Sequence, residues 1–202
     1  MLRTLIILAV LAASSAASSM AADRVDLGDV IIDRTEVTIG AFAAFAERTG
    51  LVTMAEQEGG GFEWGGGWQR RTGWTYRSPY GTPAPDNEPA VHVSWAEALA
   101  FCTDAGGRLP TREEWALAAY TEQRANPTYG FKTGQTYPYQ VGDQPQGMNN
   151  NRRHQVAVAT TKRGVNGLYD MGANVWEWLA DRRAEEALTA GGSWWYGPGA
   201  AR

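Results

Sequence analysis

Acidic side chains flank a flexible turn near the end of this sequence, and their types and spacing suit metal binding. Residues 167–181 read GLYDMGANVWEWLAD, in which Asp170 precedes the turn and Glu177 follows it. A turn rich in Gly, Ala and Asn can direct several backbone carbonyls toward one point. Two carboxylates beside such carbonyls can form an oxygen cage for a hard cation such as calcium. The stretch is therefore a candidate cation site.

The same spacing also fits a purely structural role, and taken alone it favours that role. Asp170 would then cap a turn, and Glu177 would be paired or solvated. Alternate side chains of an extended segment face opposite sides, so Trp176 and Trp178 would share one face in the core. The spacing is not that of an EF-hand loop, and pairs of carboxylates are common.

Residues 167–178, GLYDMGANVWEW, resemble the signature of the formylglycine-generating enzyme family, also called the sulfatase-modifying factor domain. Three further blocks resemble that family in its order and approximate spacing: PAVHVSWAEALAFC at 89–102, GRLPTREEWALAAY at 107–120 and GGSWW at 191–195. The resemblance covers about residues 28–195. It implies an α+β, loop-rich domain of the formylglycine-generating-enzyme fold, a variant of the C-type lectin fold, with few short antiparallel strands and about three helices.

The resemblance also implies a ligand set for one structural calcium ion. These ligands are the Asp170 and Glu177 side chains and the backbone carbonyls of Ala173 and Val175. The family often has Gly where Ala173 stands, which a carbonyl ligand tolerates if the backbone is not left-handed. Asn149–Asn151 lie where a family asparagine contributes to another calcium site, but partners for that site are not evident in the sequence.

The family's chemistry is the oxidation of a thiol substrate, converting a sulfatase cysteine to formylglycine with copper and oxygen. In the family, the copper-binding catalytic cysteines follow the Gly-Gly-Ser-Trp block. This sequence reaches Arg202 soon after that block, and its one cysteine is Cys102. The domain at 22–202 is therefore expected to be C-terminally incomplete, with no catalytic or cofactor-binding residue and no copper site. The expected consequence is an inactive domain; the alternative is a non-catalytic, C-type-lectin-like binding module.

The remaining candidate nucleophiles and ligands fit structural roles. Cys102 lies in the apolar stripe of a predicted helix, where a thiol acts as a small hydrophobe. His92 lies in an apolar strand pattern, and His154 has no second histidine or cysteine at metal spacing. Four tryptophans near the end, Trp176, Trp178, Trp194 and Trp195, are predicted to include core anchors.

Residues 1–21 have the features of a secretory signal peptide, so a periplasmic or secreted protein is expected. Arg3 precedes a short apolar run, and small residues allow cleavage after Ala21. The chain of 202 residues suits one domain, and its net charge of −4 gives no electrostatic case for nucleic acid. After cleavage we expect no membrane association, a monomer, and a protein or peptide substrate as partner.

The elements that must position these residues are indicated by caps and periodicity. Helices are predicted at about 39–48, 95–105 and 112–122, of which the last two begin with Ser/Thr-x-x-Glu capping boxes. Short strands are predicted at 30–36 and 156–160. Residues 56–88 are interpreted as a long surface loop held by its aromatic side chains. Because these aromatic residues alternate with arginines, the stacking of bases or sugars is an alternative interpretation.

Overall fold

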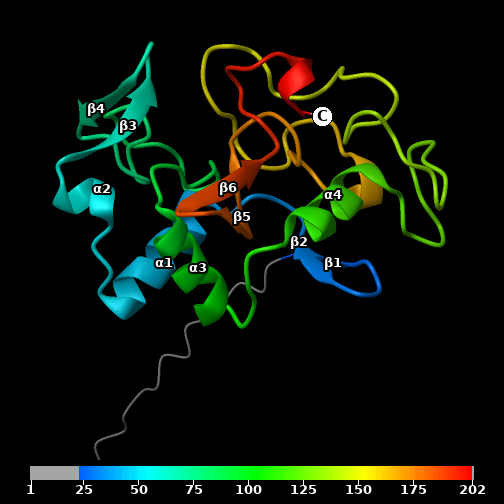
Figure 1. Ribbon diagram of the computed structural model, residues 1–202, viewed down its shortest axis with the longest axis horizontal. Coiled ribbons are helices and arrows are strands. Elements are labelled where there is room, and N and C mark those ends of the chain that lie inside the picture. Colours follow the sequence, from blue (N-terminus) through cyan, green and yellow to red (C-terminus); the bar gives the residue numbers. More distant parts are fainter. Residues whose placement is uncertain (1–22, 202) are drawn as a thin grey trace, which may run out of the picture.

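The computed structural model describes residues 23–201, so the predicted signal peptide lies outside the described residues. The strands and α-helices in chain order are β1 (Arg24–Asp26), β2 (Ile31–Asp33), α1 (Ile39–Thr49), α2 (Met54–Gln57), β3 (Gly60–Trp64), β4 (Trp68–Thr72), α3 (Trp95–Asp104), α4 (Arg112–Tyr120), β5 (Glu177–Arg183) and β6 (Glu186–Ala190). Two 3₁₀ turns, η1 (Val165–Gly167) and η2 (Pro198–Ala201), complete the order. Consecutive strands pair into three antiparallel hairpins, and long irregular segments join them (Figure 1). The predicted α+β class is confirmed.

The three predicted helices form where their caps place them. The Thr38 hydroxyl accepts a hydrogen bond from the Ala41 N–H at 3.2 Å, and α1 ends at Gly50, whose φ of 70° is left-handed. Capping boxes begin both α3 and α4. A short additional helix, α2, was not predicted. Within residues 23–201, no helix is both long and apolar enough to cross a membrane.

Glu114 belongs to the capping box that begins α4 and also forms a salt bridge with Arg108. The Glu114 carboxylate accepts the Thr111 N–H at 2.8 Å and two N–H groups of Arg108, at 2.7 and 2.6 Å. The Arg108 hydrogen bonds, and then the cap, lower the pKa of Glu114 from 4.5 to about 2. A carboxyl group whose pKa is lower in the folded state stabilises the fold above its unfolded pKa.

We expect Glu114→Gln to lower the free energy of unfolding by about 1–2 kcal/mol at pH 7. The difference from the parent chain should shrink between pH 4.5 and pH 2, because the parent carboxylate is protonated across that range. Urea unfolding of both chains at a series of pH values measures this difference in the free energy of unfolding. Equal differences at pH 7 and pH 2 would contradict the assignment.

Two segments differ from their predicted structure. Residues 56–88 contain the β3–β4 hairpin rather than an unstructured loop. Gly65–Gly67 form its turn, and Trp64 pairs with Trp68. Arg70 and Arg71 pair with Glu58 and Glu63, so these arginines are engaged within the hairpin.

Residues 156–160 form no strand, so that prediction is wrong. Ala159 is left-handed, with a φ of 59°, and the Thr160 hydroxyl donates to the Ala157 carbonyl at 2.6 Å. This turn breaks the extended backbone, leaving one backbone hydrogen bond from Val158 to Asn87, at 2.9 Å.

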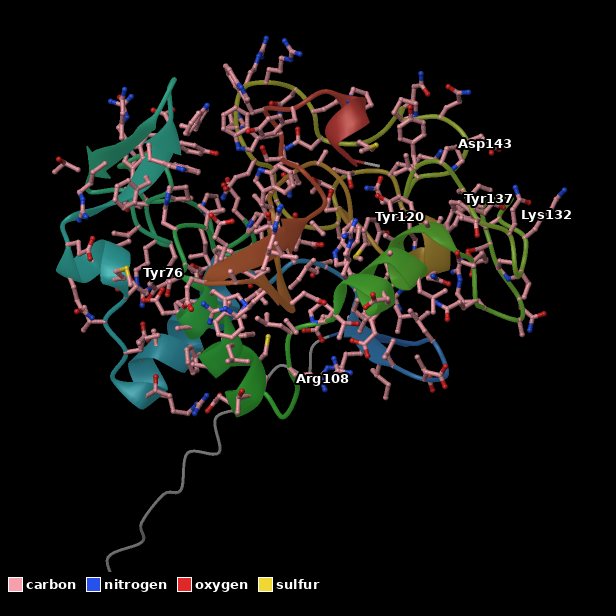
Figure 2. The ribbon with its side chains drawn as sticks, viewed as in Figure 1. Tyr76, Arg108, Tyr120, Lys132, Tyr137 and Asp143 are labelled. Carbon is pink, nitrogen blue, oxygen red and sulfur yellow. The ribbon has the colours of Figure 1, made fainter. Side chains whose placement is uncertain are left out.

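Buried apolar side chains form two main clusters in the described residues. The α4 cluster consists of Val25, Leu27, Trp115, Ala118, Ala119, Leu168, Met171 and Leu179. The α1 cluster consists of Ile39, Phe42, Ala43, Phe45, Ala46 and Tyr76. Figure 2 shows Tyr76 on the α1 side and Tyr120 on the α4 side, with the β5–β6 hairpin between them in this view.

Of the four tryptophans that were predicted to include core anchors, two are exposed and two are half-buried. Trp176 and Trp195 are 43% and 57% exposed, so neither is a core anchor. Trp178 and Trp194 are half-buried, and the Trp178 indole N–H donates to the Val93 carbonyl at 3.0 Å. The deeply buried tryptophan is Trp115, which is 5% exposed.

Candidate functional site

The turn between Asp170 and Glu177 has an unusual backbone. Asp170, Ala173 and Asn174 are left-handed, with φ angles of 56°, 68° and 50°. The condition under which alanine replaces the family's glycine without cost is therefore not met, and Ala173 bears backbone strain of about 1–2 kcal/mol at this proposed carbonyl ligand. The Ala173 N–H donates to the Gly191 carbonyl at 2.7 Å, which holds the turn against the end of β6.

The two predicted acidic ligands lie in different surroundings. Asp170 is 6% exposed, and its Oδ1 accepts the Thr161 hydroxyl at 2.6 Å. Its Oδ2 is buried and makes no hydrogen bond of good geometry among the described residues, although the nearby Ala159 N–H lowers the pKa of the carboxylate. Glu177 begins β5, and its Oε2 accepts the indole N–H of Trp115 in the α4 cluster. One carboxylate oxygen of the predicted cage therefore lacks a well-formed hydrogen bond.

Asn174 joins this turn to three distant segments. It is fully buried, and its amide donates to both carboxylate oxygens of Glu36, at 3.0 and 3.2 Å. Its Oδ1 accepts the Asn149 amide at 2.8 Å and the Val156 N–H at 2.9 Å. Asn149 is thus placed in a hydrogen-bond network with the turn, and sequence reasoning missed both Asn174 and Glu36 as parts of this site.

Three carboxyl groups around the turn have raised pKa values, for which burial is the largest cause. Burial, followed by the charges of Asp170 and Glu177, raises the pKa of Glu36 well above its ordinary value. Burial, with a smaller contribution from Asp170, raises the pKa of Glu177 to about 8. Burial also raises the pKa of Asp170. Glu36 and Glu177 nevertheless keep some exposure, because both line a cavity.

None of these three carboxylates forms a salt bridge with an Arg or Lys in the part of the chain that the structure describes. Residues 23–201 also hold no set of three or more His, Cys, Asp or Glu side chains arranged to bind a metal. The predicted cage needs two such side chains, since carbonyls supply its other protein ligands. The Asp170 oxygen that lacks a well-formed hydrogen bond, together with three carboxylates that have no salt bridge among the described residues, fits a hard cation.

Glu36 and Glu177 open onto a cavity of about 1520 Å³, whose lining does not include Asp170. His92 lines it, and its Nε2 lies 2.9 Å from the Pro79 carbonyl, in a structural contact. Cys102 also lines it, and burial, with the nearby Asp33, raises the pKa of its thiol to about 11. One sulfur held as a thiol does not fit a copper site made of paired thiolates.

A family model described as the sulfatase-modifying factor enzyme 1-like domain matches residues 8–202. The chain belongs to this family. The crystal structure of CarF has a similar fold, with a TM-score of 0.52 at 24% identity, over 81% of this chain and 74% of that one. The predicted formylglycine-generating-enzyme fold is confirmed.

The curated relatives of this chain include one protein named as an enzyme and one named as inactive. The formylglycine-generating enzyme of Thermomonospora curvata is 31% identical over 194 residues, covering 78% of this chain and 61% of that protein. The inactive C-alpha-formylglycine-generating enzyme 2 of Bos taurus is 37% identical over 108 residues, covering 46% of this chain and 33% of that protein. This chain thus spans about three fifths of the length of the first relative and a third of the second.

Proposed function

We propose that this member of the sulfatase-modifying factor family binds calcium and does not, as this chain, oxidise a thiol substrate. The observation that carries the absence of thiol oxidation is the single cysteine of this chain. The family reaction uses soft thiolate ligands to hold copper in its reduced state. Cys102 is one partly buried thiol whose pKa of about 11 disfavours the thiolate at neutral pH. A relative named as inactive gives this proposal a precedent.

Mass spectrometry tests the absence of turnover directly. The purified chain is incubated with copper, a reductant, oxygen and a peptide that carries a sulfatase motif. We expect the substrate cysteine to keep its sulfur, while the Thermomonospora curvata enzyme, as the positive control, converts it. Conversion of the peptide by this chain would overturn the proposal, and Cys102→Ala would then show whether Cys102 takes part.

Calcium is the cation that this proposal assigns to the turn. Asp170 and Glu177 would hold it with the carbonyls of Ala173 and Val175, and water or other groups would complete six to eight oxygens. The bound charge would offset the repulsion among the three carboxylates. It would also join the turn to β5, so the proposed role of the ion is structural.

We expect calcium to raise the melting temperature and a chelator to lower it. Asp170→Asn should weaken calcium binding at least tenfold, a loss of about 1.4 kcal/mol, as measured by isothermal titration calorimetry. The matched control is Asp143→Asn, an exposed carboxylate on an outer loop (Figure 2), which should bind calcium as the parent chain does. No heat of binding, together with no change in melting temperature, would contradict the site.

The proposed location is the periplasm or the cell exterior, and the proposed form is a monomer. The proposed partner is a protein or peptide rather than nucleic acid or a membrane. The acidic net charge of −4 supports this choice. Fractionation of cells that express the full chain tests the location, since retention in the cytoplasm would contradict it.

A second candidate function is a non-catalytic binding module of the C-type-lectin-like kind. Exposed aromatic rings around the cavity favour it: Trp64, Trp68, Trp176 and Trp195 are each between 43% and 70% exposed. Such rings supply rigid contact area to a ligand. Titration with soluble oligosaccharides, followed by tryptophan fluorescence, tests this function. An unchanged spectrum across the panel would argue against it.

A further inference from the structure

Three arginine side chains meet beside the backbone of Gly167, away from the large cavity. They come from segments far apart in the sequence, since Arg34 follows β2, Arg124 follows α4 and Arg163 precedes η1. A Cβ atom added to Gly167 would lie 2.8 Å from Nη1 of Arg124. The same position lies 3.2 Å from Nη1 of Arg34 and 3.3 Å from Nη2 of Arg163. Folding therefore brings three guanidinium groups to one point.

Positive charge exceeds negative charge at this point. Nε and Nη2 of Arg124 donate to the carboxylate of the fully buried Glu122, at 2.8 and 2.7 Å. Nε of Arg34 donates to Asp23, at 2.6 Å, and the Asp23 side chain is 72% exposed. Arg163 forms no salt bridge within residues 23–201. Three cations thus face two carboxylates, one of which lies at the surface and is free to be displaced.

Arg163 is held in place although it has no acidic partner. Its Nε donates to the Gly167 carbonyl at 3.1 Å, and Arg34 donates to the same carbonyl at 2.8 Å. Its guanidinium carbon lies 5.9 Å from the ring centroid of Tyr129 and 5.7 Å from that of Tyr169, distances at which a cation and a ring attract each other. These contacts orient the guanidinium without neutralising it. A guanidinium has five N–H donors, so its terminal donors remain for a ligand.

The charge and the donors select the class of ligand. With the Asp23 carboxylate displaced, the three arginines and Glu122 leave an excess of two positive charges. A phosphate monoester carries a charge of about −1.5 to −2 at pH 7 and three strong acceptor oxygens. A carboxylate carries one charge and two oxygens. Arginine also matches phosphate geometry through pairs of N–H groups, so a phosphate group satisfies this site better than a carboxylate does.

We propose that Arg34, Arg124 and Arg163 form a binding site for a phosphate group, either free or carried as a monoester by a small molecule, which displaces the carboxylate of Asp23. The β1–β2 hairpin packs against α4 in the α4 cluster (Figure 1). The bound group joins this hairpin to the segments after α4 and before η1, and so stabilises the fold. The hydrogen bond from Arg34, aided by the charges of Arg34 and Arg163, lowers the pKa of Asp23, so a carboxylate already occupies the edge of the site. The proposal requires neither calcium nor turnover.

Isothermal titration calorimetry of the full chain tests the site in a calcium-free buffer of fixed ionic strength. The probes are glycerol 3-phosphate, inorganic phosphate and acetate. We expect both phosphates to bind and to raise the melting temperature, and acetate to bind at least tenfold more weakly, because it loses a charge-assisted hydrogen bond. Either phosphate binding the tighter supports the site, and the order shows whether the ligand is a monoester or the free ion. No heat and no change in melting temperature with either phosphate, or equal binding of acetate, would overturn the proposal.

Three variants locate the binding. Arg163→Gln removes a guanidinium that has no salt bridge to break, and it should weaken phosphate binding at least tenfold. The matched control is Arg183→Gln, which removes the same charge from an exposed position on β5 and should bind as the parent chain does. Asp23→Asn removes the competing carboxylate and should strengthen binding about fivefold. Equal affinities in the two arginine variants, or no gain of affinity in Asp23→Asn, would overturn the proposal.

Discussion

Asn174→Ala should lower the free energy of unfolding by about 3–5 kcal/mol, because it removes the amide from the centre of a buried network. The substitution leaves the Val156 N–H and the Asn149 amide without their acceptor, and it removes a donor from Glu36. Each buried polar group left unpaired costs about 1–3 kcal/mol. Asn also tolerates the left-handed backbone of this position better than Ala does.

Urea unfolding of the variant measures this loss at one pH and one calcium concentration. Asn126→Ala, which changes an exposed asparagine, is the matched control and should stay within about 0.5 kcal/mol of the parent chain. An equal, small loss in both variants would show that the network contributes little. Asn174→Asp keeps the side-chain shape and places a third acidic group beside Glu36, so it should also be destabilising.

Trp115→Ala should cost about 3–5 kcal/mol, the usual loss for a buried tryptophan. Trp115 belongs to the α4 cluster, is 5% exposed and donates to Glu177. Trp115→Phe should cost less, because it fills part of the space and loses mainly the indole hydrogen bond. Trp195→Ala is the control, since its side chain is 57% exposed. Thermal unfolding of the three variants gives the comparison, and a Trp115→Ala melting temperature equal to that of the control would refute the assignment.

Local signals in the sequence predicted the helices well, whereas burial depended on distant contacts. The caps at Thr38, Ser94 and Thr111 place helix starts because the cap hydrogen bonds join residues three positions apart. Whether a tryptophan is buried depends instead on which elements pack over it. Trp195 and Trp115 both lie in recognisable family blocks, yet one is exposed and the other is deep in the core.

In the candidate site, too, the residues that are close in sequence were predicted and those brought together by folding were missed. Asp170 and Glu177 were found because they lie seven residues apart in one block. Glu36 was missed because it meets Asn174 across 138 residues of sequence. The strongly raised pKa of Glu36 depends on this convergence, because Asp170 and Glu177 add to the effect of burial, so a single sequence could not have indicated it. The proposed calcium ligands remain a prediction for the binding experiment.

The β3–β4 hairpin packs closely against His92 at its base, and its second strand is exposed along its whole length. Gly61 packs so closely on the His92 ring that an added Cβ would lie 2.3 Å from Nδ1, while every residue of β4 is exposed. Opening such a segment disturbs few buried contacts, so it requires less free energy than unfolding the whole domain. Backbone amides of β4 should therefore exchange with deuterium before those of α4. Trypsin should make its first cuts in the folded protein after Arg70 or Arg71.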